Sequence, residues 1–391
     1  MNRNRKHIVF ISSWYPSLQD PTLGIFNRYF AVAAALYNQI TVLHIKSDAH
    51  CNKEFDIHTE VSEGVTTVIV PYKKVENKIP VLSALKRKRK VLKAAEIGYD
   101  YIQKNIGKAQ LIHLNVVLPM GLAVLHLHQK FNLPFVVNEN WSGYCAEDGA
   151  YKGLMQTYFT KKIIAAAKVI MPTSTYLADA MQAHGLKGNY KIVPNVVSTH
   201  DFKPLPTPAH QGIRFIHISS LNDREKNVSG LFRAFAMALK QCNDLELHLI
   251  GDSNERKKLE QYAVELGIDD KVFFKGRKFK NELVQEINAA DAHVMFSHFE
   301  TFCLVNIEAF ACGKPVISSA AGGIKTYLRP DLGMMVPVGD ETAMAEALLA
   351  FAKNPTQFNA EHIVEYANST YSYETVGKQL DLIYNDVVAS D

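Results

Sequence analysis

Short runs of β-branched and apolar residues alternate with segments of helical periodicity along the whole chain. In the first half, six runs are predicted to be strands, at residues 7–13, 39–45, 66–72, 109–115, 134–140 and 168–174. Runs that are apolar at nearly every position are typical of parallel strands, which are buried on both faces. Helix-like segments such as FNRYFAVAAAL lie between several of these runs. The first half is therefore predicted to be a series of βαβ units.

The same pattern restarts in the second half. Five further strands are predicted at residues 214–220, 245–251, 271–276, 291–297 and 315–320, again with helical segments between them. The segment VPNVVSTHDFKPLPTPAHQG, which separates the halves, contains four prolines, a composition that favours an interdomain connection. We expect an α/β protein with two Rossmann-like, doubly wound parallel-sheet domains that face each other across a ligand-binding cleft. The expected parts are a first domain (1–195), a linker (196–212), a second domain (213–370) and a C-terminal amphipathic helix (371–391).

The composition is that of an ordinary folded protein. Hydrophobic residues make up 47% and charged residues 21% of the 391 residues, enough for two separate cores. No apolar run approaches the roughly 20 residues of a membrane-spanning helix, and the start MNRNRKHIVFISSWYP is not expected to be a signal peptide. The five cysteines are scattered without a C-x-x-C pair, which argues against a disulfide framework or a zinc site. We expect a cytoplasmic protein.

Positive charge is concentrated in one segment, Lys73 to Lys93, which we call the basic segment. It holds nine Lys or Arg residues against a single acid, Glu76, so its charge is +8 and the rest of a chain of net charge +4 carries −4. Such a segment can bind anionic lipid, nucleic acid or a phosphorylated acceptor, or it can be a solvated helix face. We expect peripheral contact with the inner face of an anionic membrane, or a phosphate-bearing acceptor, and no nucleic acid.

The candidate chemistry lies in HFETFCLVNIEAFACGKPVISSAAGG, residues 298–323. Glu300 follows a predicted buried strand, so it is expected in the loop at the strand's carboxyl end, on the cleft side. A helix is expected from about Leu304 to Gly313, which caps it, and its N-terminal amides and dipole would attract a phosphate. Glu308, one turn into this helix, can accept hydrogen bonds from a sugar diol. An anion site flanked by two carboxylates is what a nucleotide sugar requires.

These residues resemble the donor-site signature of the retaining glycosyltransferases with the GT-B fold, commonly called family four. The segments SSWYPSLQDPTLGIF, NENWSGY, KVIMPTSTYLADAM, VPNVVSTHDFKP and LIGDSNERKKLEQYAVELGIDDKVFFKG look similar to the family's usual segments, so the resemblance covers almost the whole chain. It implies transfer of a sugar from a nucleotide-diphosphate donor to a hydroxyl acceptor, with retention at the anomeric carbon and without a metal or other cofactor. It also implies that the first domain binds the acceptor, that the second binds the nucleotide sugar, and that the C-terminal helix crosses back onto the first domain.

The resemblance also implies roles for individual residues. Glu308 would hold the donor ribose and Glu300 would contact the transferred sugar, while Lys226 would balance the charge of the leaving diphosphate. Gly24 would lie in a loop that approaches the donor from the first domain. The further candidates for donor binding are the backbone amides of Phe302, Cys303 and Leu304, together with Thr301, Gly251 and Arg277.

The chain departs from the family pattern at several positions. Thr301 and Cys303 stand where glycine is usual, so their side chains are expected to narrow the sugar pocket and alter donor choice. Asn140 stands where many relatives have histidine, near the transferred sugar; it can form hydrogen bonds but cannot titrate near neutral pH. His113 is a second candidate in the first domain, although a lone histidine at a strand end is more often structural.

Ser220 stands where the family usually has an arginine. Arg224 lies two residues before Lys226, in a loop one residue longer than usual. We predict that Arg224 supplies the missing second cation to the diphosphate. The alternative is a solvated arginine that pairs with Asp223 or Glu225.

Three classes of function remain open from the sequence. The favoured one is a glycosyltransferase that acts on a surface-glycan, lipid-linked or small-molecule acceptor. The others are a nucleotide-sugar epimerase on the same fold and a non-catalytic nucleotide-sugar-binding protein. The sugar, the nucleobase, the linkage and the oligomeric state do not follow from the sequence.

Overall fold

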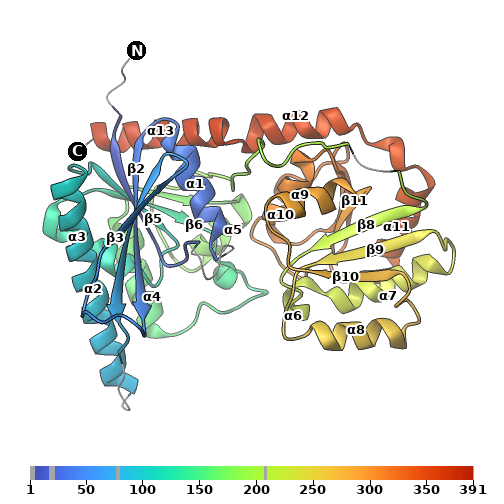
Figure 1. The fold of residues 1–391 in the computed structure, drawn as a ribbon, viewed down its shortest axis with the longest axis horizontal. Coiled ribbons are helices and arrows are strands. Elements are labelled where there is room, and N and C mark those ends of the chain that lie inside the picture. Colours follow the sequence, from blue (N-terminus) through green and yellow to red (C-terminus); the bar gives the residue numbers. More distant parts are fainter. Residues whose placement is uncertain (1–4, 17–22, 76–79, 207–208, 391) are drawn as a thin grey trace.

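The computed structural model describes residues 5–16, 23–75, 80–206 and 209–390, and these form two α/β domains that lie side by side (Figure 1). The first sheet has seven strands in the order β3-β4-β2-β1-β5-β6-β7, and the second has six in the order β10-β9-β8-β11-β12-β13. Neighbouring strands run parallel, except that β3 pairs antiparallel with β4. The prediction of two Rossmann-like parallel-sheet domains is confirmed.

The elements of the first domain are β1 (His7–Ser12), α1 (Ile25–Ala35), β2 (Gln39–Asp48), β3 (His58–Ser62), β4 (Val65–Lys73), α2 (Pro80–Asn105), β5 (Leu111–Asn115), α3 (Gly121–Phe131), β6 (Phe135–Glu139), α4 (Leu154–Ala166), β7 (Val169–Pro172) and α5 (Thr175–Ala183). Those of the second are β8 (Ile213–Ile218), α6 (Asp223–Lys226), α7 (Val228–Leu239), β9 (Leu245–Ile250), α8 (Arg256–Glu265), β10 (Val272–Gly276), α9 (Asn281–Asn288), β11 (Ala292–Met295), α10 (Leu304–Ala311), β12 (Val316–Ser319), β13 (Gly333–Val336), α11 (Glu341–Lys353) and α12 (Ala360–Tyr371), before the final helix α13 (Tyr373–Ala389).

Every strand predicted from the sequence overlaps an observed strand, but β3 and β13 were not predicted. All five residues of β3 are exposed, so this edge strand lacks the apolar run on which the prediction relied. Strand β13 has only four residues and begins with a glycine. Parts of the segments named above lie outside the described residues. They are residues 17–22, residues 207–208 of the linker, and Glu76 and Lys78 of the basic segment.

Each sheet is covered on both faces, as a parallel sheet requires. In the first domain, α2, α3, α4 and α5 pack on one face, and α1 and α13 pack on the other. Alternate residues of β1 serve the two cores, because Val9 packs with the first group and Phe10 with the second. Helix α13 therefore belongs to the first domain although it follows the second, as Figure 1 shows. The expected return of the C-terminal helix is confirmed.

The chain passes between the domains at two places that lie next to each other. Val196 packs in a core of the first domain and Val197 in a core of the second. The amide of Val197 donates to the carbonyl oxygen of Tyr371, at 2.9 Å, and Tyr371 is the last residue of α12, directly before α13 begins. If one domain rotated relative to the other, these two neighbouring connections would be the hinge.

Candidate active site

A cavity of about 400 Å³ lies between the domains, at the carboxyl ends of their strands. The first domain contributes the segments that follow β1, β5 and β6, and the second contributes those that follow β8 and β11. Strands β1 and β8 lie where the strand order reverses in each sheet, the usual place for ligands in open α/β sheets. The predicted site residues that line the cavity are Gly24, Asn140, Lys226, Glu300 and Thr301.

Lys226 and Glu300 form an ion pair in this cavity. Lys226 ends α6, a single helical turn, so the predicted loop is partly helical. Its Nζ donates to Oε1 of Glu300 at 2.7 Å, and the two side chains are 18% and 10% exposed. Ser297 Oγ donates to the same carboxylate oxygen at 2.8 Å. Burial acts to lower the pKa of Lys226, but the adjacent Glu300 carboxylate outweighs it and raises that pKa above its usual value. The cavity therefore holds a fixed cation beside a carboxylate.

Gly24 shapes the opposite wall of the cavity. It is the N-cap residue of α1 and has a left-handed conformation, with φ of 66°. A Cβ at this position would lie 2.4 Å from the carbonyl oxygen of Trp14, so only glycine allows this approach. The same Trp14 oxygen accepts a hydrogen bond from Asn27 Nδ2 at 2.6 Å, which ties the segment after β1 to α1.

Helix α10 begins next to Glu300 and Thr301. The side chains of Phe302 and Cys303 are 2% and 8% exposed and pack in a core of the second domain. Thr301 therefore lines the cavity, whereas the Cys303 side chain does not. Among the described residues, the amides of Phe302, Cys303 and Leu304 donate to no backbone or side-chain acceptor. Free amides at a helix N-terminus beside a cation suit an anionic ligand.

Glu308 lies in the middle of α10 and is 5% exposed. No hydrogen-bond partner of its carboxylate occurs among the described residues, and burial raises its pKa to about 7. It is not among the lining residues of the 400 Å³ cavity. A buried carboxylate without a donor is unfavourable, and a ligand that donates two hydroxyl groups would relieve this cost.

Hydrogen bonds join the two domains at the rim of the cavity. Thr301 Oγ1 donates to the carbonyl oxygen of Asn140 at 3.1 Å. The carbonyl oxygen of Thr301 accepts a hydrogen bond from Ser174 Oγ at 2.7 Å. Arg224 donates to the carbonyl oxygen of Asp148 at 3.0 Å and lies 3.3 Å from its carboxylate. Arg224 thus pairs with Asp148 of the first domain. The alternative partners named from the sequence, Asp223 and Glu225, form no ion pair with it in the described parts of the chain.

Three other predicted residues lie away from this cavity. Gly251 follows β9 with φ of 134°, and a Cβ there would lie 1.8 Å from the carbonyl oxygen of Ser219, so its requirement for glycine is steric. Arg277 follows β10 and is exposed. His113 is fully buried, and its Nδ1 lies 2.6 Å from the hydroxyl oxygen of Tyr384 in α13. Burial lowers the pKa of His113 to about 3, so this neutral ring fastens α13 to the sheet.

Glu139 was not predicted as part of the site, although it organises two of the segments that form the cavity. Its fully buried carboxylate accepts hydrogen bonds from the amides of Val117, Asn140 and Trp141, at 3.0, 2.9 and 2.9 Å. Burial raises the pKa of Glu139, although these amides oppose the shift. The signal was present in the sequence, because an acid that ends an apolar strand needs an internal partner.

No group of His, Cys, Asp and Glu among the described residues could hold a metal ion. Over the same residues, no helix is long and apolar enough to cross a membrane. All five cysteines are unpaired.

The fold and the cavity define a GT-B architecture, and known proteins share it. The sucrose-phosphate synthase of Thermosynechococcus elongatus superposes with a TM-score of 0.77 at 23% identity, over 99% of this chain and 100% of that one. Residues 206–370 match the family described as glycosyl transferases group 1. This match covers most of the second domain.

Two curated relatives extend the similarity. The N-acetyl-alpha-D-glucosaminyl L-malate synthase of Bacillus anthracis is 31% identical over 179 residues, which are 45% of this chain and 46% of the relative. The alpha-monoglucosyldiacylglycerol synthase of Streptococcus pneumoniae is 22% identical over 76% of this chain and 70% of the relative. The chain thus spans about half the length of the first relative and more of the second. Neither relative is named as an epimerase or as a binding protein, so these matches give those two alternatives no support.

Proposed function

We propose that the protein transfers a sugar from a nucleotide-diphosphate sugar to a hydroxyl group of a glycan, lipid-linked or small-molecule acceptor, with retention of the anomeric configuration. The observation that carries the proposal is the largely buried Lys226–Glu300 pair in the interdomain cavity, next to the N-terminus of α10. The leaving diphosphate gains negative charge as the glycosidic bond breaks. A preorganised cation and free helix amides would stabilise this charge.

The mechanism requires little from a protein base. The oxygen of the leaving phosphate, on the same face of the sugar as the acceptor, can take the proton of the acceptor hydroxyl. Glu300 would position the transferred sugar through its hydroxyl groups. The interdomain contacts of Thr301 and Arg224 favour a closed arrangement that keeps water from the reacting sugar. We propose that no metal takes part, because Lys226 and the α10 amides supply the positive charge.

A thermal-shift screen against UDP-, GDP- and ADP-sugars in the presence of EDTA tests donor binding. A ligand that binds the native state raises stability by about RT ln(1 + [L]/Kd), so one nucleotide class should raise Tm without added Mg²⁺. Turnover of the selected donor should also survive EDTA. Loss of activity with the chelator, restored by Mg²⁺ or Mn²⁺, would contradict metal independence.

Glu308→Gln is expected to weaken donor binding while it stabilises the ligand-free protein. Removing the charge leaves the ribose hydroxyls with a poorer hydrogen-bond acceptor, which should reduce the free energy of donor binding by about 1 to 3 kcal/mol. The folded-state pKa of about 7 lies above the ordinary glutamate value of 4.5, so the native state loses stability as pH rises from about 4.5 to about 7. The variant avoids this loss, of up to roughly 3 kcal/mol, at pH 8.

Calorimetry with the selected nucleotide and urea unfolding at pH 5 and pH 8 measure the two effects of Glu308→Gln. Weaker nucleotide binding together with a gain in stability confined to pH 8 is the expected result. Unchanged nucleotide affinity would contradict the ribose assignment.

Glu300→Ala is expected to lower turnover more than donor affinity. Without this carboxylate the reacting sugar is misplaced and Lys226 loses its counter-ion, and together these effects cost on the order of 1 to 3 kcal/mol. Steady-state kinetics should show kcat reduced roughly 10- to 100-fold with KM for the donor changed by less than about threefold. A raised donor KM with an unchanged kcat would assign Glu300 to ground-state binding.

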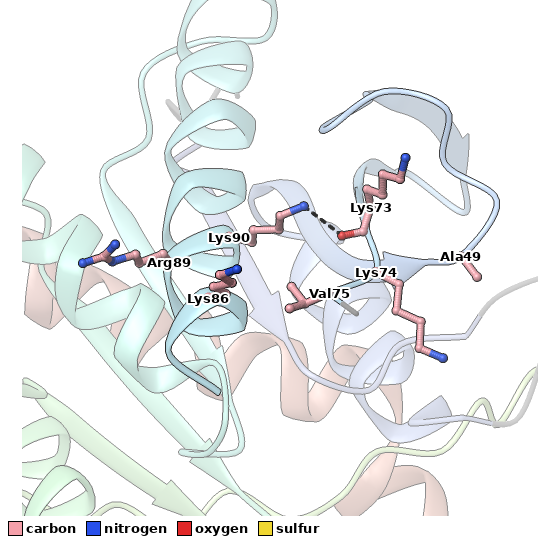
Figure 2. Close-up of a pocket in the computed structure, with 7 residues that line it drawn as sticks. All are labelled: Ala49, Lys73, Lys74, Val75, Lys86, Arg89 and Lys90. Atoms are coloured by element: carbon pink, nitrogen blue, oxygen red, sulfur yellow. Dashed lines mark hydrogen bonds between the residues drawn. The ribbon is translucent and has the colours of Figure 1, made fainter. Parts of the chain in front are cut away.

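We further propose that the basic segment contacts an anionic membrane surface. Its residues 86–89 lie on α2 and are exposed. Figure 2 shows Lys90 pointing from α2 towards Lys73, whose carbonyl oxygen it reaches at 3.1 Å, and Arg89 pointing from the opposite side of the helix. Each cation near an anionic bilayer is worth up to about 1 kcal/mol.

Exposed apolar side chains on α4 support this proposal. Lys88 of α2 lies over the ring of Phe159 in α4, 4.9 Å from its centre, so α4 borders the basic segment. Leu154, Met155 and Tyr158 of α4 are 90%, 69% and 60% exposed. Apolar side chains next to lysines and arginines are typical of surfaces that bind at a membrane interface. One of the relatives described above is named for a glucosylated diacylglycerol.

Lys86→Gln combined with Lys90→Gln is expected to reduce flotation with vesicles that contain 30 mol% phosphatidylglycerol. The parent should float at low salt and less at 0.5 M NaCl, because salt screens exposed charges. Lys257→Gln with Lys258→Gln removes two exposed charges from α8 of the second domain and should leave flotation unchanged. Equal flotation of the parent with neutral and anionic vesicles would return the basic segment to a solvated helix face.

A further inference from the structure

A second cavity, of about 450 Å³, opens between α2 and α3 in the first domain. It lies at the carboxyl ends of β1, β2 and β4, the same edge of the sheet that forms the interdomain cavity. Ile45, Val91 and Met120 give it apolar walls, and Met120 is only 5% exposed. An apolar wall of this kind accommodates a hydrocarbon portion of a ligand.

Helix α2 also brings positive charge to this cavity. Arg87 and Lys88 of α2 line it, together with Tyr72 of β4. Burial raises the pKa of Tyr72, and the positive charge of Arg87 opposes that shift, so the guanidinium lies close to the ring. Within the described residues, no carboxylate forms an ion pair with Arg87. A guanidinium beside a phenol is suited to bind a phosphate or carboxylate group.

Ser13 lies next in the chain to a residue of the interdomain cavity. It lines the second cavity, and its buried Oγ has no hydrogen-bond partner in the described part of the chain. The next residue, Trp14, lines the interdomain cavity. A buried hydroxyl without a partner is rare in folded proteins, and here it stands where a ligand in the second cavity would reach towards Lys226 and Glu300.

We propose that the cavity between α2 and α3 is the acceptor pocket and that the acceptor is an acidic amphiphile. Its anionic group is bound by Arg87 and Lys88, its apolar part packs on Val91 and Met120, and its reacting hydroxyl passes Ser13 into the interdomain cavity. This inference rests on the proposed glycosyl transfer for its function, but binding can be measured without turnover. The anionic group is therefore that of a lipid headgroup, and a soluble phosphate without an apolar part is the alternative that the test must exclude.

Titration calorimetry of the full chain with three probes tests the inference. The probes are dioctanoyl phosphatidic acid, dioctanoylglycerol and glycerol 3-phosphate, each used below its aggregation concentration. Phosphatidic acid should bind at least 10-fold more tightly than dioctanoylglycerol, which lacks the charge. Glycerol 3-phosphate should bind at least 10-fold more weakly than phosphatidic acid, because it lacks the apolar part. Equally tight binding of glycerol 3-phosphate would show that the apolar wall is not used and would overturn the amphiphilic acceptor.

Variants on α2 separate the pocket from general electrostatics. Arg87→Gln should weaken binding of phosphatidic acid at least 10-fold, and Ala84→Trp, at an exposed lining position, should block it. Arg89→Gln removes the same charge from a residue that does not line this pocket and should change binding by less than twofold. Equal losses for Arg87→Gln and Arg89→Gln, or tight binding of dioctanoylglycerol by the parent, would overturn the inference. Phosphatidic acid has no free hydroxyl, so turnover is tested with dioctanoyl phosphatidylglycerol. Acid-selective binding without release of nucleoside diphosphate from any nucleotide sugar would instead count against the proposed function.

Discussion

Lys226→Ala is expected to lower kcat roughly 10²- to 10³-fold, the range observed when one preorganised transition-state contact is removed. Lys226 is 18% exposed and is held 2.7 Å from Glu300, so its charge is already in place when the diphosphate begins to leave. A donor whose ribose and base bind elsewhere should retain most of its affinity. The expected signature is therefore a large loss of kcat with a small change in donor KM.

Lys314→Ala is the matched control for Lys226→Ala. Lys314 is a partly buried lysine of the same domain, just past the opposite end of α10, and burial lowers its pKa. This variant should keep kcat within twofold of the parent. Stability measurements on both variants separate catalysis from unfolding. A kcat within threefold of the parent for a folded Lys226→Ala protein would remove Lys226 from the mechanism.

Arg224→Ala is also expected to lower kcat roughly 10²- to 10³-fold. A diphosphate carries more negative charge than Lys226 and the N-terminus of one helix can balance. Ser220, where the family usually has an arginine, supplies no positive charge. In the structure Arg224 is 64% exposed and reaches Asp148 of the other domain. We predict that it exchanges this partner for the diphosphate when the donor binds, since an exposed ion pair contributes only about 0 to 1 kcal/mol.

Asp148→Asn distinguishes two roles of Arg224. It removes the carboxylate and leaves the carbonyl oxygen that Arg224 also contacts. If Arg224 stabilises the leaving group, Asp148→Asn should change kcat by less than about threefold. If Arg224 only joins the domains, both variants should lose activity to a similar, small extent. A catalytic rate within twofold of the parent for Arg224→Ala would show that a single cation suffices.

The sequence predicted the layered architecture because buried parallel strands produce long apolar runs. It placed Glu300 correctly at the end of β11 and Glu308 inside α10, since both positions follow from one strand and one helix. It did not reveal β3, whose residues are all exposed and which pairs with β4 along one edge of the sheet. Element boundaries of this kind depend on tertiary partners that local patterns do not encode.

The site was predictable where a residue's place follows from its own element, and not where it depends on the other domain. The partner of Arg224 is Asp148, 76 positions away, so no local pattern indicated it. Glu139 accepts a hydrogen bond from the amide of Val117, 22 positions earlier in the chain. Cys303 was expected to narrow the sugar pocket, but its left-handed backbone directs the side chain into a core instead.

In the proposed function, the interdomain cavity transfers a sugar from a nucleoside diphosphate to the acceptor with retention of the anomeric configuration. Combined ³¹P and ¹H NMR of the purified protein with the donor selected by thermal shift, with and without an acidic amphiphile as acceptor, tests it most directly. We expect release of the nucleoside diphosphate and a first-formed product with the same anomeric configuration as the donor. Neither signal should appear with the Lys226→Ala variant. A product of inverted configuration, or a donor converted to its 2-epimer, would contradict it.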